Sequence, residues 1–178
     1  WPLDTRFLNK LARQQWIDIA KDLQYALSDS VINYAIHQLP PELFAINGET
    51  IIRQLQSRRD KLEKYAVSYY EFLAKKVMIM GTDKNELFEV NRINERETQI
   101  SVYKISKEKE VKEMIYSRIF TGSETKEVRL FGLKGNDVFK LTGIPNGRVE
   151  VGILGVQKDD VVVNETGTSK TDQTEIHR

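Results

Sequence analysis

Apolar residues recur every three or four positions through the first part of the chain, which is the spacing of amphipathic helices. The pattern predicts one helix over residues 4–27 and a shorter one over 31–39. Pro40 and Pro41 end the second helix, because proline lacks an N–H donor and pushes the preceding residue out of the helical region. The longest pattern covers residues 49–78, and three helices with short connections predict an antiparallel helical layer.

Beyond Gly81 the helical spacing ends, and short runs with alternating apolar and polar residues begin. Two such runs, 87–93 and 98–105, flank a polar turn and therefore predict a β-hairpin. A third strand is expected over residues 114–120, before a turn that contains glycine. This part of the chain is consequently predicted to be rich in β-strands.

The stretch from Lys126 to Glu165 consists of short β-branched runs separated by turns of Gly, Asn, Asp and Pro. Its segments Gly132–Phe139 and Gly155–Val162 repeat each other at an offset of about 23 residues, a spacing typical of stacked β units. Two copies are visible, whereas solenoids usually need about three or more. We therefore expect consecutive β-arcs or hairpins here rather than a long solenoid.

Together these patterns predict an α+β protein with three parts. Residues 1–80 form a helical subdomain, the antiparallel helical layer. Residues 81–166 form a β-rich subdomain of short, mostly antiparallel strands or β-arcs, with the turn repeat in two copies. Residues 167–178 are polar and lack periodicity, so they are expected to form a tail or a linker.

The composition is that of a globular protein with balanced charge. The 178 residues include 27 basic and 26 acidic side chains, and the net charge of +1 supplies no long-range attraction for nucleic acid. No apolar run approaches the length of about 18 residues that spans a bilayer. Cysteine is missing, which excludes disulfides and thiolate catalysis. The chain begins at Trp1 rather than Met, and we expect it to be a piece of a longer protein.

The sharpest candidate for ligand chemistry is the repeated turn. Gly132–Phe139 partly matches the calcium-binding nonapeptide of repeats-in-toxin β-rolls, although Leu133 replaces the second glycine. In the second copy Asp160 fits the motif, but Lys158 occupies a glycine position. Asp137 and Asp160 are therefore candidate calcium ligands, because a calcium roll holds each ion with several oxygens between successive coils. The alternative is a pair of tight turns, in which Asp and Asn make local hydrogen bonds.

Other candidate sites are less specific. Arg58 and Arg59 are candidates for anion binding, and the alternative is a solvated helix face or an ion pair with the adjacent Asp60. With only His37 and His177 and no cysteine, a transition-metal site would rest almost wholly on carboxylates, which is uncommon. A catalytic triad would have to use His37, and no nucleophile elbow accompanies it. The sequence has no Walker loop and no dinucleotide-binding glycine motif.

Several segments, taken in order, resemble one region of large cell-envelope proteins from Bacteroidetes-type bacteria. Those proteins are described as calcineurin-like metallophosphoesterases, with the phosphoesterase domain upstream and an outer-membrane barrel often downstream. The metal-binding motifs of that chemistry, Gly-Asp-x-His and Gly-Asn-His, are not in this sequence, so no catalytic residue is carried over. The segments that carry the resemblance are Leu39–Glu42, Ser57–Asp60, Tyr69–Leu73, Gly81–Val90 and Val128–Phe139.

The resemblance implies a non-catalytic accessory or connector domain of an envelope protein, periplasmic or associated with the outer membrane. Its partners would be the neighbouring domains of the parent chain, which would itself be a hydrolase. A first alternative is a binding module for calcium, a glycan or a protein, using the turns around Asp137 and Asp160. A second is a hydrolase that uses carboxylates together with Arg58 or Arg59.

Overall fold

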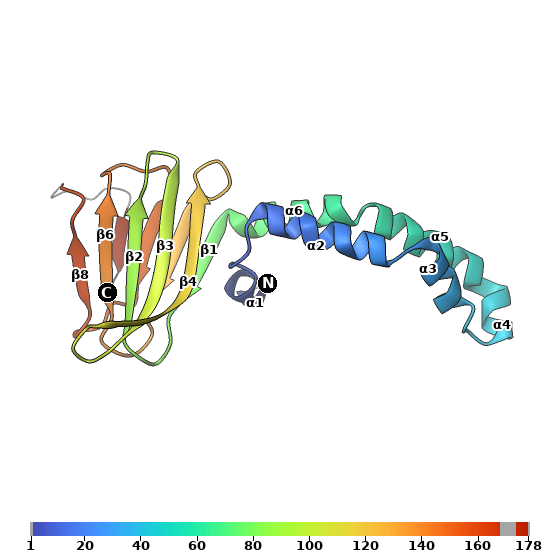
Figure 1. Cartoon of the computed structure of the whole chain (residues 1–178), viewed down its shortest axis with the longest axis horizontal. Coiled ribbons are helices and arrows are strands. Elements are labelled where there is room, and N and C mark those ends of the chain that lie inside the picture. Colours follow the sequence, from blue (N-terminus) through green and yellow to red (C-terminus); the bar gives the residue numbers. More distant parts are fainter. Residues whose placement is uncertain (1, 168–173, 178) are drawn as a thin grey trace. The chain divides into compact units, whose positions relative to one another are not determined.

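The computed structural model describes residues 2–167 and 174–177. It divides into two compact units, which we call the helical unit, Ala12–Phe72, and the β unit, Trp1–Leu11 with Leu73–Arg178. The helices and strands of these units confirm the predicted α+β class (Figure 1). The boundary lies at Phe72 rather than near residue 80, because Lys76–Met80 is already a strand that pairs within the β unit.

The helical unit contains two long antiparallel helices, α2 and α6, and confirms the expected antiparallel layer. Arg13 near the start of α2 pairs with Glu71 near the end of α6, with 2.6 Å between Nη2 and Oε1. Further along, Lys21 Nζ lies 4.0 Å from Glu63 Oε1. The elements are α2 (Arg13–Ala26), α3 (Asp29–Ile36), α4 (Pro41–Leu43), the π-helical turn η1 (Phe44–Gly48), α5 (Glu49–Asp60) and α6 (Leu62–Ala74).

The helix predicted over residues 49–78 is divided and shorter. Lys61 has φ −100° and ψ 3°, which lie outside the helical region, and separates α5 from α6. The end of the predicted helix, Val77 and Met78, lies in strand β1. No glycine or proline marks either change, so the apolar spacing alone did not reveal them.

The helix predicted over residues 4–27 is also divided, into α1 (Pro2–Phe7) and α2. Asn9 lies between these two helices. Like α1, it belongs to the β unit, and it bonds to strands of that unit. Its side-chain amide donates to the carbonyl of Met78, and its own carbonyl accepts from Tyr116 Oη at 3.0 Å and Arg118 Nη1 at 2.6 Å. These tertiary bonds replace the local hydrogen bonds that would continue the helix.

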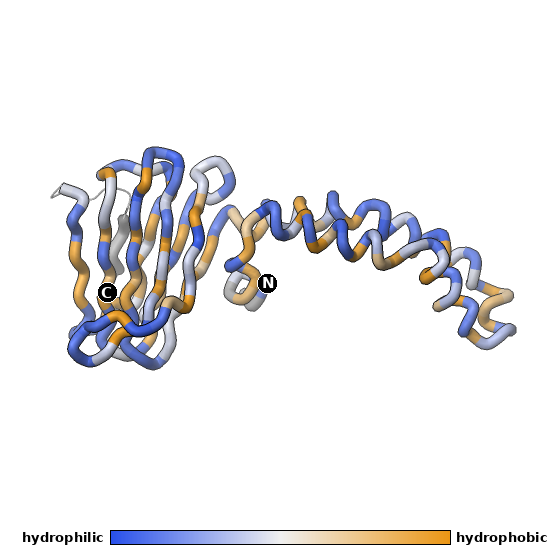
Figure 2. Tube along the Cα trace, viewed as in Figure 1, coloured by the Kyte–Doolittle hydropathy of each residue, from blue (hydrophilic) through white to orange (hydrophobic). Residues whose placement is uncertain are grey.

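The strands of the β unit form two sheets, and hydrophilic and hydrophobic residues alternate along several of these strands (Figure 2). The four-stranded sheet has the order β1 (Lys76–Met80), β5 (Glu127–Phe131), β7 (Glu150–Leu154), β9 (Thr174–His177). The five-stranded sheet has the order β4 (Val111–Thr121), β3 (Glu97–Ile105), β2 (Glu86–Arg92), β6 (Val138–Gly143), β8 (Val161–Asn164).

The chain alternates between the two sheets in successive coils, and we call this arrangement the β-roll. Strands β1 and β2 form the first coil, β5 and β6 the second, and β7 and β8 the third, all paired in parallel with the equivalent strands of the next coil. Glu127 faces Glu150, 23 positions later, which is the offset of the sequence repeat. Strand β9 then pairs with β7 in parallel.

Antiparallel pairing joins β2 to β3 and β3 to β4, as predicted for the hairpin and the third strand. Of the two alternatives expected for this part, β-arcs are confirmed and mostly antiparallel strands are not, because β-arcs between parallel strands build both sheets beyond this hairpin. The predicted polar tail is corrected in part, since Thr174–His177 is strand β9. Residues 168–173 and 178 of that tail lie outside the described residues.

The core lies between the two sheets of the β-roll. Phe88 and Phe139 stack there with 4.8 Å between ring centroids, and neither is exposed. Burial of each such side chain contributes roughly 1.5–3 kcal/mol to folding. Further core residues are Val90, Ile100, Val128, Leu130, Val151 and Ile153. Among the described residues, no helix has the length and apolar character needed to cross a membrane.

Candidate functional site

Three turns that lead from the four-stranded to the five-stranded sheet end in acidic residues at equivalent positions. These residues are Glu86, Asp137 and Asp160, one in each coil, and we call them the carboxylate ladder. Each directly precedes or begins a strand of the five-stranded sheet, in which Leu87 faces Val138 and Val138 faces Val161. The parallel register therefore stacks the three acids on one another.

Each acid of the second and third coils accepts a hydrogen bond from the main chain of the coil before it. Asp137 Oδ1 accepts from the amide of Glu86 at 2.8 Å, and Asp160 Oδ1 accepts from the amide of Asp137 at 2.9 Å. The second oxygen of Asp160 accepts from the amide of Gln157 at 2.7 Å. The ladder thus joins successive coils through main-chain N–H groups that need a partner when buried.

The first acid, Glu86, is fully buried, and groups of its own turn donate hydrogen bonds to its carboxylate. Glu86 Oε2 accepts from the amide of Thr82 at 3.0 Å, and Oε1 accepts from the Thr82 hydroxyl. Gly132 in the second turn leaves room for the ladder, because a Cβ at that position would collide with Asp137 Oδ2. Glycine is required there by the space that the carboxylate occupies.

Burial raises the pKa of the Asp137 carboxyl to about 7. The hydrogen bond from the Glu86 amide acts in the opposite direction, and the nearby charges of Glu86 and Asp160 raise the pKa further. Asp137 is only 1% exposed, so solvent does little to stabilise its charge. This carboxyl therefore changes protonation close to neutral pH.

Asp137 and Asp160, the predicted calcium ligands, are brought together by the fold. Three of their carboxylate oxygens, however, accept hydrogen bonds from main-chain amides. In residues 2–167 and 174–177, no group of three or more acidic or histidine side chains is placed to hold a metal ion. The geometry favours the tight-turn interpretation, and calcium binding stays a prediction.

The sequence contains a third copy of the turn that the repeat at 23 residues does not reveal. Gly81–Phe88 is equivalent to Gly132–Phe139, but the offset is 51 residues, as the pairing of Lys76 with Glu127 shows. The β3–β4 hairpin is inserted between these two copies and lengthens the first coil. Asn, an acid, an apolar residue and Phe follow in the same order in both segments, and this signal identifies Glu86 as a member of the ladder.

Arg59, one of the two candidate anion-binding residues, is used within the helical unit. Its Nη1 donates to Asp29 Oδ1 at 2.6 Å and to the carbonyl of Leu27 at 2.9 Å, while Nη2 donates to Asp60 Oδ1 at 2.8 Å. The hydrogen bonds to Asp29 and Asp60 raise the pKa of the guanidinium above its ordinary value. Arg59 therefore holds the turn between α2 and α3 on the end of α5.

Arg58 is separate from this cluster and exposed. It lines an open depression of about 430 Å³ on the helical unit, together with Arg53, Lys61 and Tyr65 among others. The structure therefore does not bring Arg58 and Arg59 into one site. Arg58 keeps the character of an anion-binding candidate, with two further cations beside it.

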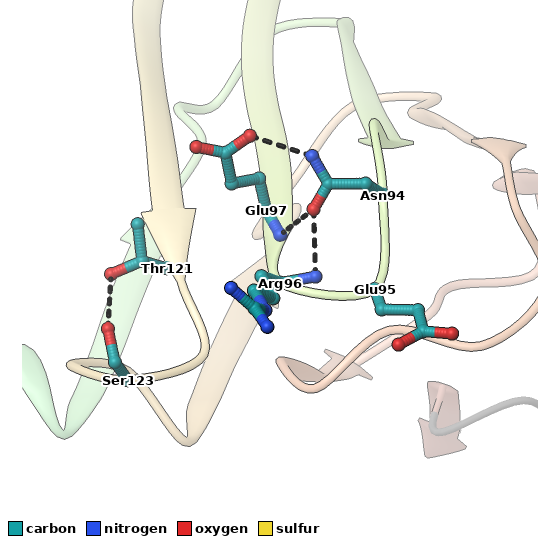
Figure 3. A pocket seen from close by; sticks show the side chains of 6 residues that line it. All are labelled: Asn94, Glu95, Arg96, Glu97, Thr121 and Ser123. Carbon is teal, nitrogen blue, oxygen red and sulfur yellow. Dashed lines mark hydrogen bonds between the residues drawn. The ribbon is translucent and has the colours of Figure 1, made fainter.

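A depression of about 560 Å³ on the β unit is not indicated by the sequence pattern (Figure 3). It lies at the turn between β2 and β3, where Asn94 Oδ1 accepts from the amides of Arg96 and Glu97 at 2.9 and 3.0 Å. Asn94 Nδ2 also donates to Glu97 Oε2 at 2.8 Å. On the other side, the hydroxyls of Thr121 and Ser123 bond to each other. These polar groups stabilise the turn that forms the depression.

Comparison of the chain with models of known protein families, with curated proteins and with solved structures finds no match.

Proposed function

We propose that this chain is a non-catalytic accessory or connector domain of a larger cell-envelope protein. The observation that carries the proposal is the carboxylate ladder. In an enzyme, acidic residues with raised pKa values face a cleft that a substrate can enter. Here Asp137 and Glu86 are buried, and their oxygens accept hydrogen bonds from main-chain or Thr82 groups of the turns.

The β-roll supports a scaffolding role. Its strands pair in register from coil to coil, and the largest apolar side chains lie in the closed core between the sheets. Parallel stacking of this kind gives a rigid body, in which each coil depends on its neighbour. A rigid body of this kind is suited to holding adjacent domains at a set distance.

The envelope setting comes from the resemblance to the metallophosphoesterase proteins, and the parent chain would be a hydrolase. Antibodies against the purified chain test this setting in fractions of the source cells. We expect the signal in the envelope fraction, on a protein much larger than 20.6 kDa. A cytosolic band of 20.6 kDa would contradict the proposal.

The non-catalytic role is tested by incubating the chain with p-nitrophenyl phosphate and bis-p-nitrophenyl phosphate in the presence of Mn²⁺, Mg²⁺ or Zn²⁺. We expect no turnover above a buffer control. Turnover that Arg58→Ala or Asp137→Asn removes would instead support the carboxylate-dependent hydrolase. Circular dichroism of both variants distinguishes loss of activity from loss of fold.

A further inference from the structure

The pair of helices α2 and α6 has two unlike faces. The ion pairs Arg13–Glu71 and Lys21–Glu63 mark one face, and they also set which residues of the antiparallel helices lie side by side. With about 3.6 residues per turn, the opposite face of α2 carries Ile19 and Leu23, and that of α6 carries Leu62, Tyr65 and Ala66. We call these five residues the apolar face.

Three of the five side chains are exposed and Leu62 and Ala66 are half-buried; none of the five is charged, and Tyr65 also borders the depression that holds Arg58 and Lys61. Ile19 is 49% exposed, Leu23 is 48% exposed and Tyr65 is 52% exposed. The register set by the two ion pairs places Ile19 level with Tyr65, and Leu23 close to the level of Leu62, so the apolar positions follow one another along the helical pair. A contiguous exposed apolar patch on a helical pair is typical of an interaction surface.

The edges of the apolar face carry opposite charges. Asp22 lies at the outer edge of α2, and Lys61, the residue directly before α6, lies near the same height beside the start of that helix. Both side chains are exposed. An amphipathic surface that binds anionic lipid has basic residues along its polar edges, so the acidic edge of α2 does not fit that class of partner.

We propose that the apolar face pairs with the same face of a second copy of this chain, to form an antiparallel four-helix bundle. A two-fold axis parallel to the helices places α2 of one copy against α6 of the other, and neighbouring helices then run antiparallel throughout. The same operation brings Asp22 of one copy next to Lys61 of the second copy, and it does so twice. The apolar faces of the two copies can therefore pack without charge repulsion, and the acidic edge of one copy lies against the basic edge of the other.

The oligomeric state of the whole chain tests the proposal, by sedimentation equilibrium across the micromolar range. We expect a concentration-dependent dimer. Leu23→Glu and Tyr65→Glu place like charges in the centre of the contact and are expected to give monomers. Gln14→Glu adds the same charge to an exposed position of α2 on the side away from Leu23, and it is the matched control.

The arrangement of the two copies is tested by charge exchange at the edges. Asp22→Lys or Lys61→Asp alone is expected to weaken the dimer by roughly threefold for each pair lost, and the double variant is expected to restore it. A wild-type monomer at all concentrations would overturn the proposal, as would a dimer that Leu23→Glu and Tyr65→Glu leave intact. Failure of the double variant to recover would overturn the pairing of α2 with α6.

Misfolding is separated from loss of contact by circular dichroism. Leu23→Gln and Tyr65→Gln are the second pair of variants, since glutamine favours helices and adds no charge. They are expected to weaken the dimer at unchanged helix content. A dimer of wild-type strength with unchanged helix content in these variants would also contradict the proposal. The experiment is independent of the accessory role, because neither catalysis nor the envelope setting enters it.

Discussion

The β unit and the helical unit treat their apolar residues in opposite ways. In the β unit, Phe88, Phe139 and Leu130 are completely buried between two sheets. In the helical unit, the buried apolar residues are small in number, and large side chains such as Tyr25 and Ile46 are exposed at 90% and 72%. The apolar side chains of the β-roll core are buried by the chain itself, whereas the helical unit exposes apolar side chains that a partner could cover.

The same contrast applies to charge. The β unit buries Glu86 and Asp137, and hydrogen bonds from Thr82 in the same turn and from the Glu86 amide of the preceding coil satisfy the two carboxyl groups, respectively. The helical unit keeps its ion pairs near the surface, where solvent screens them and each is worth little. We therefore expect local opening to be easier in the helical unit, and hydrogen exchange to be slower in the β-roll.

The largest difference between the units is expected from truncation of one aromatic side chain in each. Phe139→Ala removes a fully buried ring from the core and is expected to lower the free energy of unfolding by about 3–5 kcal/mol. Tyr25→Ala removes a ring that is 90% exposed and should change it by less than about 0.5 kcal/mol. Urea denaturation followed by circular dichroism measures both. Equal losses would contradict the contrast.

The second prediction concerns the pH dependence of the β unit. The pKa of Asp137 is raised to about 7 in the folded protein, above about 3.9 in the unfolded chain. The folded state therefore binds the proton more tightly, and the free energy of unfolding falls as pH rises from about 4 to about 7. The slope approaches about 1.4 kcal/mol per pH unit in the middle of that range and vanishes above it.

Asp137→Asn removes the titrating group and keeps an oxygen that accepts from the Glu86 amide. We expect this variant to lose the fall in stability between about pH 4 and pH 7. Denaturant titrations at several pH values measure the effect, and Asp83→Asn, at an exposed position of the first turn, is the control. A wild-type slope that persists in Asp137→Asn would assign the pH dependence to another group.

The third prediction tests the space that the ladder needs. Gly132→Ala places a Cβ against the carboxylate of Asp137, which its hydrogen bond to Glu86 holds in position. The expected loss of unfolding free energy is about 1–3 kcal/mol. Gly152→Ala in strand β7 is the matched control, because the nearest atom to its Cβ would be 3.8 Å away. That variant should be neutral or slightly more stable, since alanine restricts the unfolded chain.

Part of the fold follows from local patterns in the sequence. The largely alternating apolar and polar residues over 87–93 and 98–105 predict the antiparallel hairpin, which the pairing of β2 with β3 confirms. The division of the first helix is not predictable in this way, since Asn9 breaks it through bonds to Met78, Tyr116 and Arg118 that only the folded chain supplies. Distant partners override a local helical pattern in this case.

The parallel register of the coils and the stacking of the ladder residues do not follow from the local sequence pattern, for a related reason. Two turn copies at an offset of 23 residues are visible, but the inserted hairpin moves the first copy to an offset of 51. The acids Asp137 and Asp160 are recognisable as a repeated feature of the sequence. Their use as acceptors for main-chain amides depends on the register between coils, which residue types alone do not specify.

The smallest expected effect is that of calcium on the β unit. Calcium takes about six to eight oxygen ligands, and three carboxylate oxygens of Asp137 and Asp160 already accept from main-chain amides. If Asp137 turned away to bind the ion, it would release the Glu86 amide from a buried hydrogen bond, which costs about 1–3 kcal/mol. Calorimetric titration of the chain with calcium chloride should therefore give no heat beyond a magnesium control, and no rise in Tm. A heat of binding that Asp160→Asn abolishes would show that the ladder is a calcium site. The β unit would then, like the helical unit, have side chains available for a binding partner.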